Sequence, residues 1–360
     1  MRVMLDSGAY TAYTQDKIID LDNYSNFILT NKNYINTVVN LDVINPKDPE
    51  VAAEAGRENF LKLRDKGIIT VPVFHARERL NWLNLMLDDC SYIGLSGTSL
   101  VSPREDRQWH DLVWSYVTDS DGFPIADFHS FGNTSDRVLT TYPFKTADSC
   151  TWMISGCRAG RIKLRGKTFQ LRTKKIGDLN YIDESDTGLK RESWEEEISK
   201  LGLNPQILMN TIIRKDEKGN TKRGDGVILP MLRSYLHAAD LLDIQEQSRS
   251  CTKYDARPSL LSLKKQLTGG VERKEPIRTI LVIAPATYYF NYPVIYALGV
   301  KDILISYYYI STMESTKMKF WEEKMIPFLE DPKSFLESDE KTRRMWYKLN
   351  EVLLKPVGAL

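Results

Sequence analysis

Short apolar runs rich in β-branched residues alternate with longer amphipathic stretches through the first 155 residues. The apolar runs predict six strands, at Arg2 to Asp6, Tyr34 to Ile44, Thr70 to His75, Tyr92 to Gly97, Pro124 to Gly132 and Thr146 to Met153. The stretches between them predict helices at Asp22 to Asn31, Pro49 to Lys66, Arg77 to Leu87, Asp106 to Val117 and Ser135 to Thr141. Each crossover is long enough for a right-handed βαβ unit, so the pattern predicts a parallel sheet.

Two further apolar runs bring the number of predicted strands to eight. They are Thr279 to Ala286 and Asp302 to Ile310, and they flank a predicted helix at Tyr288 to Leu298. Eight strand and helix units predict an α/β fold of the TIM (β/α)8 barrel type. An open doubly wound sheet is the competing architecture, but the chain has no glycine-rich phosphate loop of the GxGxxG or GxxxxGKS kind.

The spacing of the predicted strands divides the chain into four parts. Residues 1–155 hold the first six strand and helix units, 156–276 form a large insertion between strands 6 and 7, 277–310 hold the last strands, and 311–360 form a C-terminal helical extension. Within the insertion we expect hairpins at Cys157 to Lys175 and Arg214 to Gly226, and helices at Ser193 to Leu201 and Leu229 to Ser248.

Composition favours an ordinary globular protein with a large core, since 42% of the residues are hydrophobic and 27% are charged. No run of eighteen apolar residues and no signal segment occurs, so we expect a cytoplasmic protein without a membrane partner. The four cysteines, Cys90, Cys150, Cys157 and Cys251, form no CxxC pair. They therefore predict neither a disulfide framework nor a zinc site.

The net charge of +1 conceals one strongly basic segment. Cys157 to Lys175 contains eight basic residues and no acidic one. The eight are Arg158, Arg161, Lys163, Arg165, Lys167, Arg172, Lys174 and Lys175. Such a cluster neutralises phosphates and releases counterions, so it predicts binding of nucleic acid, with a merely solvated hairpin as the alternative.

Polar side chains recur where the predicted strands end, which is where a TIM barrel has its active site. Asp6 and Asp148 end different strands, and two such carboxylates suit cleavage of a glycosidic bond, because one can trap the sugar while the other moves protons. Carboxylates that share a pocket also push their titrations apart. Each of these aspartates has an alternative role as a helix or turn cap.

Several more residues at these ends predict a pocket for a flat base. Asp42 can accept two hydrogen bonds from the amidine edge of a guanine, and Ser96 and Gly97 offer a hydroxyl and a close backbone approach. Tyr10 and Phe131 are suited to stacking on a base, although aromatic residues at such places also serve as core or lid. His75 and His129 complete the predicted substrate pocket, or satisfy core hydrogen bonds.

Several of these motifs resemble those of the tRNA-guanine transglycosylase superfamily. DSGAY resembles the family's DSGGF motif, LDVI its strand-end aspartate motif, YIGLSG its glycine-rich base-binding turn, and HSFG the segment before its nucleophile, in the same order over residues 1 to 155. The run HSFGNTSDRVLTTYPFKTADSCTW is most similar to the phage and bacterial branch that exchanges guanine in DNA for a 7-deazaguanine.

The resemblance implies a pentosyltransferase that needs no ATP or other cofactor. By analogy, Asp148 attacks the sugar C1′ and expels guanine, Asp6 deprotonates the incoming 7-deazaguanine, and Asp42 with the turn at Ser96 and Gly97 holds the base. The tRNA enzymes carry a CxCxxC and histidine zinc site that this chain lacks, and the basic insertion stands in its place. A DNA substrate would have to be flipped or unpaired before attack.

Three other functions stay open at this point. The first is a transglycosylase that acts on tRNA instead of DNA. The second is a metal-dependent hydrolase with four metal ligands, Asp6, His75, His129 and Asp148. The third is an inactive barrel that only binds nucleic acid. Against the hydrolase, no HxH or HxxEH pair occurs. The sequence does not predict the oligomeric state.

Overall fold

The structure is a computed structural model, and a part of the chain is described. The described residues are 1–97, 100–154, 161–164, 167–170, 196, 199–200, 204, 213–215, 221–223, 228–242, 251–255, 275, 277–284, 288–312 and 316–353. The chain forms two compact units. The first comprises Met1–Ser149, Gln247–Pro285 and Lys301–Trp321, and the second comprises Cys150–Glu246, Ala286–Val300 and Glu322–Leu360.

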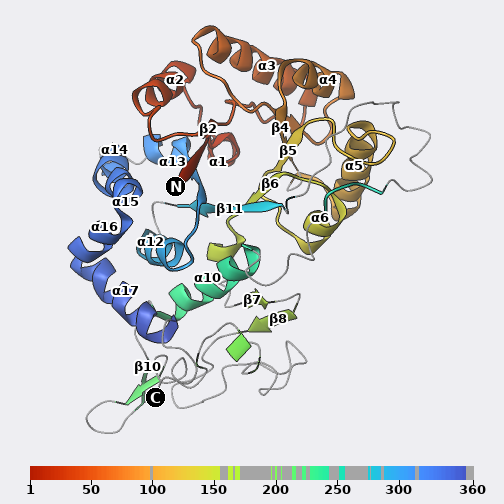
Figure 1. Ribbon diagram of the computed structural model, residues 1–360. Helices are drawn as coiled ribbons and strands as arrows, with labels where there is room; N and C mark the ends of the chain where they lie inside the picture. Colours follow the sequence, from red (N-terminus) through yellow and green to blue (C-terminus); the bar gives the residue numbers. More distant parts are fainter. Residues whose placement is uncertain are drawn as a thin grey trace. The chain divides into compact units, whose positions relative to one another are not determined.

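The first unit is built on an eight-stranded parallel sheet (Figure 1). Its strands are β1 (Arg2–Asp6), β2 (Thr37–Val38), β3 (Val73–His75), β4 (Tyr92–Ser96), β5 (Asp127–Ser130), β6 (Thr146–Ser149), β11 (Arg278–Ile283) and β12 (Asp302–Ser306). They follow one another in the order β2-β1-β12-β11-β6-β5-β4-β3. The predicted α/β fold with eight parallel strands is thus confirmed.

The sheet curls until its two edge strands meet at one point. Val39, just after β2, forms a parallel bridge with Val71, just before β3. The Asn40 N–H donates to the Val71 carbonyl over 2.9 Å, and the Val71 N–H donates to the Val38 carbonyl over 2.8 Å. No continuous ladder joins β2 to β3 in the described residues, so the sheet has the strand order of a TIM barrel without being a fully closed one.

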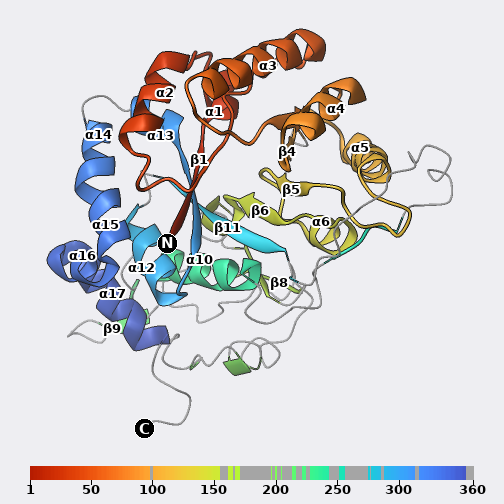
Figure 2. The ribbon, with the colours of Figure 1, turned by 45° about the horizontal axis from the view of Figure 1, so that its top comes forward.

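The described helices of the first unit lie between consecutive strands, except for α13 and α14, which follow the last strand (Figure 2). They are α1 (Ala9–Thr14), α2 (Leu21–Thr30), α3 (Pro49–Asp65), α4 (Leu80–Asp89), α5 (Pro103–Tyr116), α6 (Asp136–Thr141), α13 (Tyr307–Thr312) and α14 (Thr316–Phe320). Asp48 caps α3 by accepting the Val51 N–H, and Gly67 stops it at φ 76°. Ser102 and Glu105 form a capping box on α5.

Two apolar clusters cover the two faces of the sheet. On the inner face Met4, Val39, Val73, Ile280 and Leu304 pack together, one from each of five strand segments. On the outer face a second buried cluster joins strand residues to α4, α5 and α6; its members include Phe74, Leu83, Ile93, Leu95 and Trp114. Alternate strand residues therefore face the inside of the curl, which is the pattern of a filled barrel interior.

Three predicted strands are wrong at their ends. The strand predicted to reach Ile310 ends at Ser306, which pairs with the last residue of β1, and the chain turns into α13 at Tyr307. Tyr307 and the residues after it have strand propensity, but the ladder between β1 and β12 ends at Asp6 and Ser306, and only the Tyr308 N–H continues it, donating to the Ser7 carbonyl over 3.1 Å. The strand predicted to reach Met153 ends at Ser149, and the one predicted at Tyr34 to Ile44 forms only a two-residue ladder.

The second unit contains two antiparallel pairs and a set of helices. β7 (Arg161–Leu164) pairs with β8 (Lys167–Gln170), and β9 (Ile213–Lys215) with β10 (Thr221–Arg223), where the sequence predicted hairpins. Its helical elements are α10 (Ile228–Leu241), α12 (Tyr288–Ala297), the π-helical turn η5 (Trp321–Met325), which begins at the last residue of the first unit, α15 (Ile326–Glu330), α16 (Pro332–Ser338) and α17 (Glu340–Leu353). Tyr292 of α12 is fully buried and stacks on Phe328 at 4.4 Å between ring centroids. Most of the predicted helix at Ser193 to Leu201 lies outside the described residues.

Candidate active site

Acidic and basic side chains from different strands meet at the carboxyl edge of the parallel sheet. Asp6, His75 and Ser96 are the last residues of β1, β3 and β4, and the segment after β2 contributes another carboxylate. The members on described strands or directly after them are Asp6, Asp42, His75, Ser96, His129 and Asp148. Parallel strands place their carboxyl ends at one edge, so residues 142 positions apart in the chain become neighbours.

Asp148 is held by two hydrogen bonds to one of its oxygens. The His129 Nε2 lies 3.0 Å from Asp148 Oδ1, and the Gly132 N–H donates to the same oxygen over 3.0 Å. His129 is fully buried, and Asp148 is 6% exposed. The other ring nitrogen of His129, Nδ1, lies 2.6 Å from the Thr146 hydroxyl, which also contacts the Tyr92 hydroxyl. We call His129 and Asp148 the β5–β6 pair.

Asp42 belongs to a second histidine and carboxylate arrangement. Its Oδ2 lies 2.9 Å from His75 Nε2, and its Oδ1 accepts the Ser7 hydroxyl over 3.3 Å. On the far side of the ring, His75 Nδ1 lies 3.0 Å from Glu78 Oε1, while the His75 N–H donates to Oε2 of the same residue. The chain Asp42–His75–Glu78 therefore places one imidazole between two carboxylates.

The two carboxylates decide the charge of His75. Burial lowers the pKa of a histidine, but the hydrogen bonds to Asp42 and Glu78 and their negative charges outweigh it and raise the pKa of His75 to about 10. His75 is consequently an imidazolium at neutral pH that donates from both ring nitrogens. It fixes the Asp42 carboxylate in one orientation.

Asp6 lies in the electric field of both arrangements. Burial is the main cause that raises its pKa, the negative charge of Asp42 comes next and that of Asp148 third, while hydrogen bonds from the Gly8 and Ser7 backbone lower it. The net result is a pKa of about 7. A carboxyl group with this pKa can give and take a proton at neutral pH, which is the property that acid–base catalysis requires.

Ser306 lies beside Asp6, and sequence reasoning missed it. It is the register partner of Asp6 across β1 and β12, and its buried hydroxyl has no hydrogen-bond partner in the described structure. Gly8, at φ 82°, leaves room for it, since a Cβ there would lie 2.3 Å from the Ser306 Oγ. Glu78, Thr146, Tyr92 and Gly132 were missed as well. Glu78, Thr146 and Gly132 lie two or three positions from His75, Asp148 and His129 in the sequence, which is their only signal there. Tyr92 has no such signal, because it reaches Thr146 only across the sheet.

The predicted base-stacking residues take different places. The ring of Phe131 packs edge-on against His129 at 4.2 Å between centroids and sits over Gly94, where a Cβ would lie 2.3 Å from it. Phe131 thus covers the inner cluster at the site and keeps part of its surface exposed. Tyr10 lies on α1 and is 47% exposed, and within the described structure it makes no hydrogen bond or ring contact with the site residues.

The predicted turn after β4 brings its backbone against the end of β3. The Ala76 N–H donates to the Ser96 carbonyl over 3.0 Å. Gly97 has φ 93°, and a Cβ there would lie 2.9 Å from the Ala76 nitrogen, so no other residue fits without a shift. Ser96 is half-buried beside His75, its register partner on β3.

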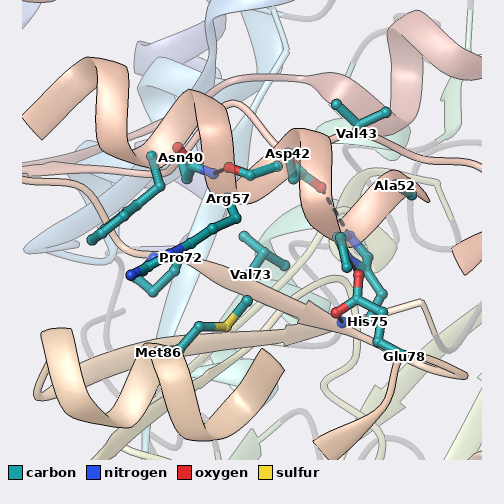
Figure 3. Close-up of a pocket in the computed structure, with 13 residues that line it drawn as sticks. Asn40, Asp42, Val43, Ala52, Arg57, Pro72, Val73, His75, Glu78 and Met86 are labelled. Atoms are coloured by element: carbon teal, nitrogen blue, oxygen red, sulfur yellow. Dashed lines mark hydrogen bonds and ion pairs between the residues drawn. The ribbon is translucent and has the colours of Figure 1, made fainter. Parts of the chain in front are cut away.

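Two adjoining cavities border the Asp42–His75–Glu78 chain (Figure 3). The first, of about 340 Å³ with its opening, lies between α3 and the segments of β2 and β3, and Figure 3 shows Asp42 and His75 joined across it. Asn40 lines this cavity with a buried Oδ1 that has no partner in the described residues. The second, of about 360 Å³, is lined by His75, Glu78 and the loops after β2, β3 and β4.

The basic segment is described only in part. Arg161 and Lys163 lie on β7 and Lys167 lies on β8, and these are placed by their backbone. The other predicted nucleic-acid contacts, Arg158, Arg165, Arg172, Lys174 and Lys175, lie outside the described residues.

Neither a metal site nor a membrane-spanning helix is present in the described residues. They contain no group of three or more histidine, cysteine, aspartate or glutamate side chains arranged to hold a metal ion. Among the helices of the same residues, none has the length and the apolar character needed to cross a membrane. Comparison of the chain with protein-family models, curated proteins and solved structures found no match in any of the three.

Proposed function

We propose that this protein is a guanine transglycosylase that replaces guanine in DNA by a 7-deazaguanine base through a covalent aspartyl-glycosyl intermediate. One observation carries the proposal. Asp6 and Asp148, from strands at opposite ends of the first half of the chain, lie close enough at one sheet edge for the charge of Asp148 to raise the pKa of Asp6. Two neighbouring carboxyl groups, of which one has a raised pKa, can supply a nucleophile and a proton carrier for the exchange of one glycosidic bond.

The proposal includes a more specific description of the fold and of its division into parts. The eight parallel strands form a barrel of the (β/α)8 type whose edge strands β2 and β3 meet only through the bridge between Val39 and Val71. Residues 156–276 are an insertion between the sixth and seventh strands, and residues 311–360 are a C-terminal extension. The supporting observation is the strand order, which runs around the sheet in chain order once the bridge is counted.

In the first step the ionised Asp148 attacks C1′ of the nucleotide. A bond forms between the carboxylate oxygen and C1′, and the bond from C1′ to N9 of guanine breaks, with its electron pair passing to the base. Asp6 has a pKa of about 7 and is protonated at a lower pH, and it gives this proton to the departing guanine. The step ends with a glycosyl ester on Asp148, a neutral guanine and an Asp6 carboxylate.

In the second step the incoming 7-deazaguanine reverses these changes. Its N9–H passes a proton to the Asp6 carboxylate while N9 attacks C1′ and expels the Asp148 carboxylate. Asp6 returns to its protonated form and Asp148 to its ionised form, so no cofactor and no net proton are consumed. The reaction exchanges one glycosidic bond for another of similar energy, which is why no ATP is needed.

The base and the polymer are held by separate parts of the chain. Asp42, oriented by the charged His75, keeps lone pairs for the amidine edge of guanine, and Phe131 provides an apolar face beside it. Ser96 and Gly97 bound the pocket on the β4 side. The basic segment from Cys157 to Lys175 contacts phosphates without reading sequence, and tRNA is the alternative polymer.

The test is exchange of labelled guanine, with duplex DNA, single-stranded DNA and tRNA assayed side by side. We expect label to enter DNA, and a protein–DNA adduct to survive denaturation. Asp148→Asn should lower exchange by about a thousandfold or more and abolish the adduct, because the nucleophile is lost. Asp88→Asn, at an exposed position of α4, is the matched control and should exchange normally.

Each outcome of this assay bears on the proposal. Label in tRNA alone would reassign the polymer to tRNA and contradict a DNA enzyme. No label in any polymer, or an Asp148→Asn variant as active as the wild type, would overturn base exchange at this site.

A further inference from the structure

The two oxygens of the Asp148 carboxylate have different surroundings. Oδ1 accepts from the Gly132 N–H and from His129, each over 3.0 Å. Within the described part of the chain, Oδ2 has no hydrogen bond. The carboxylate therefore has one oxygen that is held and one that is available, although nothing in its covalent structure distinguishes them.

We propose, building on the proposed function, that His129 is a positioning residue. As a neutral imidazole with its proton on Nε2, it holds Oδ1 and leaves Oδ2 as the oxygen that attacks C1′. Tyr92 and Thr146 select that tautomer by a chain of hydrogen bonds that runs in one direction, from Tyr92 through Thr146 and His129 to Asp148.

The direction of this chain follows from the donors available. A carboxylate oxygen accepts only, so Nε2 of His129 must carry the proton in its contact with ionised Asp148. In the neutral ring Nδ1 is then an acceptor, and the Thr146 hydroxyl 2.6 Å away donates to it. The Thr146 oxygen in turn accepts from the Tyr92 hydroxyl. Each contact in this series of hydrogen bonds therefore has one donor and one acceptor.

The ring is also fixed mechanically. His129 is fully buried, and its faces and edges meet Phe131 and Tyr92 at 4.2 and 6.5 Å between ring centroids. It therefore has one orientation in which both nitrogens find partners. In the covalent intermediate Oδ1 becomes the carbonyl oxygen of the ester and keeps its two donors, while Oδ2 forms the bond to C1′. His129 itself neither gains nor loses a proton.

Nitrogen-15 NMR of the wild-type protein tests the tautomer without any substrate. The chain has four histidines, so the imidazole resonances are few, and His129→Gln assigns those of His129 by their loss. We expect a neutral ring at pH 7 with a protonated Nε2 and a hydrogen-bonded, unprotonated Nδ1. Thr146→Val should shift the Nδ1 resonance, and Thr140→Val, an exposed threonine of α6, should not.

Kinetics then test the positioning role. His129→Leu removes the donor to Oδ1 and should lower kcat about a hundredfold with little change in the KM for the incoming base, since a misdirected nucleophile loses rate and not base binding. His129→Gln keeps an amide N–H near the Nε2 position and should recover about tenfold of that loss. Thermal denaturation of both variants reports whether they fold.

The outcomes separate this inference from the function beneath it. A wild type that forms no adduct and exchanges no base overturns the proposed function, and the positioning role of His129 with it. An active wild type whose His129 is doubly protonated, or protonated on Nδ1 alone, overturns the tautomer. Folded Leu and Gln variants with equal activity overturn the positioning role alone.

Discussion

The two histidine and carboxylate arrangements at the sheet edge contain the same pair of residue types but differ in their charge. On the β2–β3 side His75 lies between Asp42 and Glu78, and on the β5–β6 side His129 lies between Asp148 and the Thr146 hydroxyl. Both imidazoles are buried, and each contacts its aspartate through Nε2 at about the same distance. The difference is the group that meets Nδ1.

That one neighbour sets the charge of the whole arrangement. A second carboxylate stabilises the imidazolium, so Asp42, His75 and Glu78 together carry one negative charge at neutral pH. A hydroxyl can donate to Nδ1, so in the proposed arrangement His129 is neutral and leaves Asp148 with its full negative charge. An ionised aspartate next to a cation is suited to holding a substrate, and one next to a neutral donor is suited to acting as a nucleophile.

Among the changes that compare the two arrangements, replacing Asp6 should have the largest effect, because this carboxyl group lies in the electric field of both and moves the proton in both steps of the proposed reaction. We expect Asp6→Asn to lower the exchange rate by about a hundredfold or more. In the wild type, adduct formation should fall as the pH rises through about 7, since the first step needs protonated Asp6. Rapid-quench measurement of the adduct between pH 5 and 9 gives this profile.

The matched control for this change is Asp16→Asn, at an exposed position after α1. It should leave both the rate and the pH profile unaltered. A flat profile in the wild type, or an Asp6→Asn variant with the wild-type profile, would remove Asp6 from the proton transfer.

The charge of His75 should appear in the pH dependence of stability. Its pKa in the folded protein, about 10, exceeds the ordinary histidine value of 6.5, so the folded state binds more protons between these values. The resulting stabilisation is complete below pH 6.5 and is lost as the pH rises through 10. We expect the free energy of unfolding of the wild type to fall in this window by up to about 5 kcal/mol more than that of His75→Asn.

Urea denaturation at a series of pH values measures both curves. Glu78→Gln should reduce the difference, because His75 then has one carboxylate partner, whereas Glu58→Gln, an exposed position of α3, should leave it unchanged. Parallel curves for the wild type and His75→Asn would show that His75 is not a cation in the folded protein. The β2–β3 side would then be no different in charge from the β5–β6 side.

Much of the architecture was predictable because it depends on local patterns. Helices α2, α3 and α12 lie within a few residues of the predicted ranges, since their apolar spacing, caps and stop signals are all local. Strand ends were less predictable. The run after Ser306 has the residues of a strand, but its ladder with β1 ends at Asp6 and the chain continues as a helix.

The site was predictable in its residues but not in its connections. Asp6, Asp42, His75, His129 and Asp148 all follow from their place at strand ends. The groups that set their charge were not predictable in the same way, because Thr146 and Tyr92 reach His129 across neighbouring strands. Which nitrogen meets a hydroxyl and which meets a carboxylate is a property of the packed sheet.

The smallest effect is also the most direct comparison of the two sides, because Asp6 responds to the charge of each. The charge of Asp42 raises the pKa of Asp6 more than the charge of Asp148 does. Asp42→Asn should therefore lower that pKa further than Asp148→Asn, with both changes smaller than the effect of burial, which either variant retains. Titration of the Asp6 carboxyl carbon by carbon-13 NMR measures the shifts in both variants. Equal shifts would mean that the two aspartates affect Asp6 alike, and a larger shift in Asp148→Asn would place the proton carrier closer to the nucleophile than to the base-holding side.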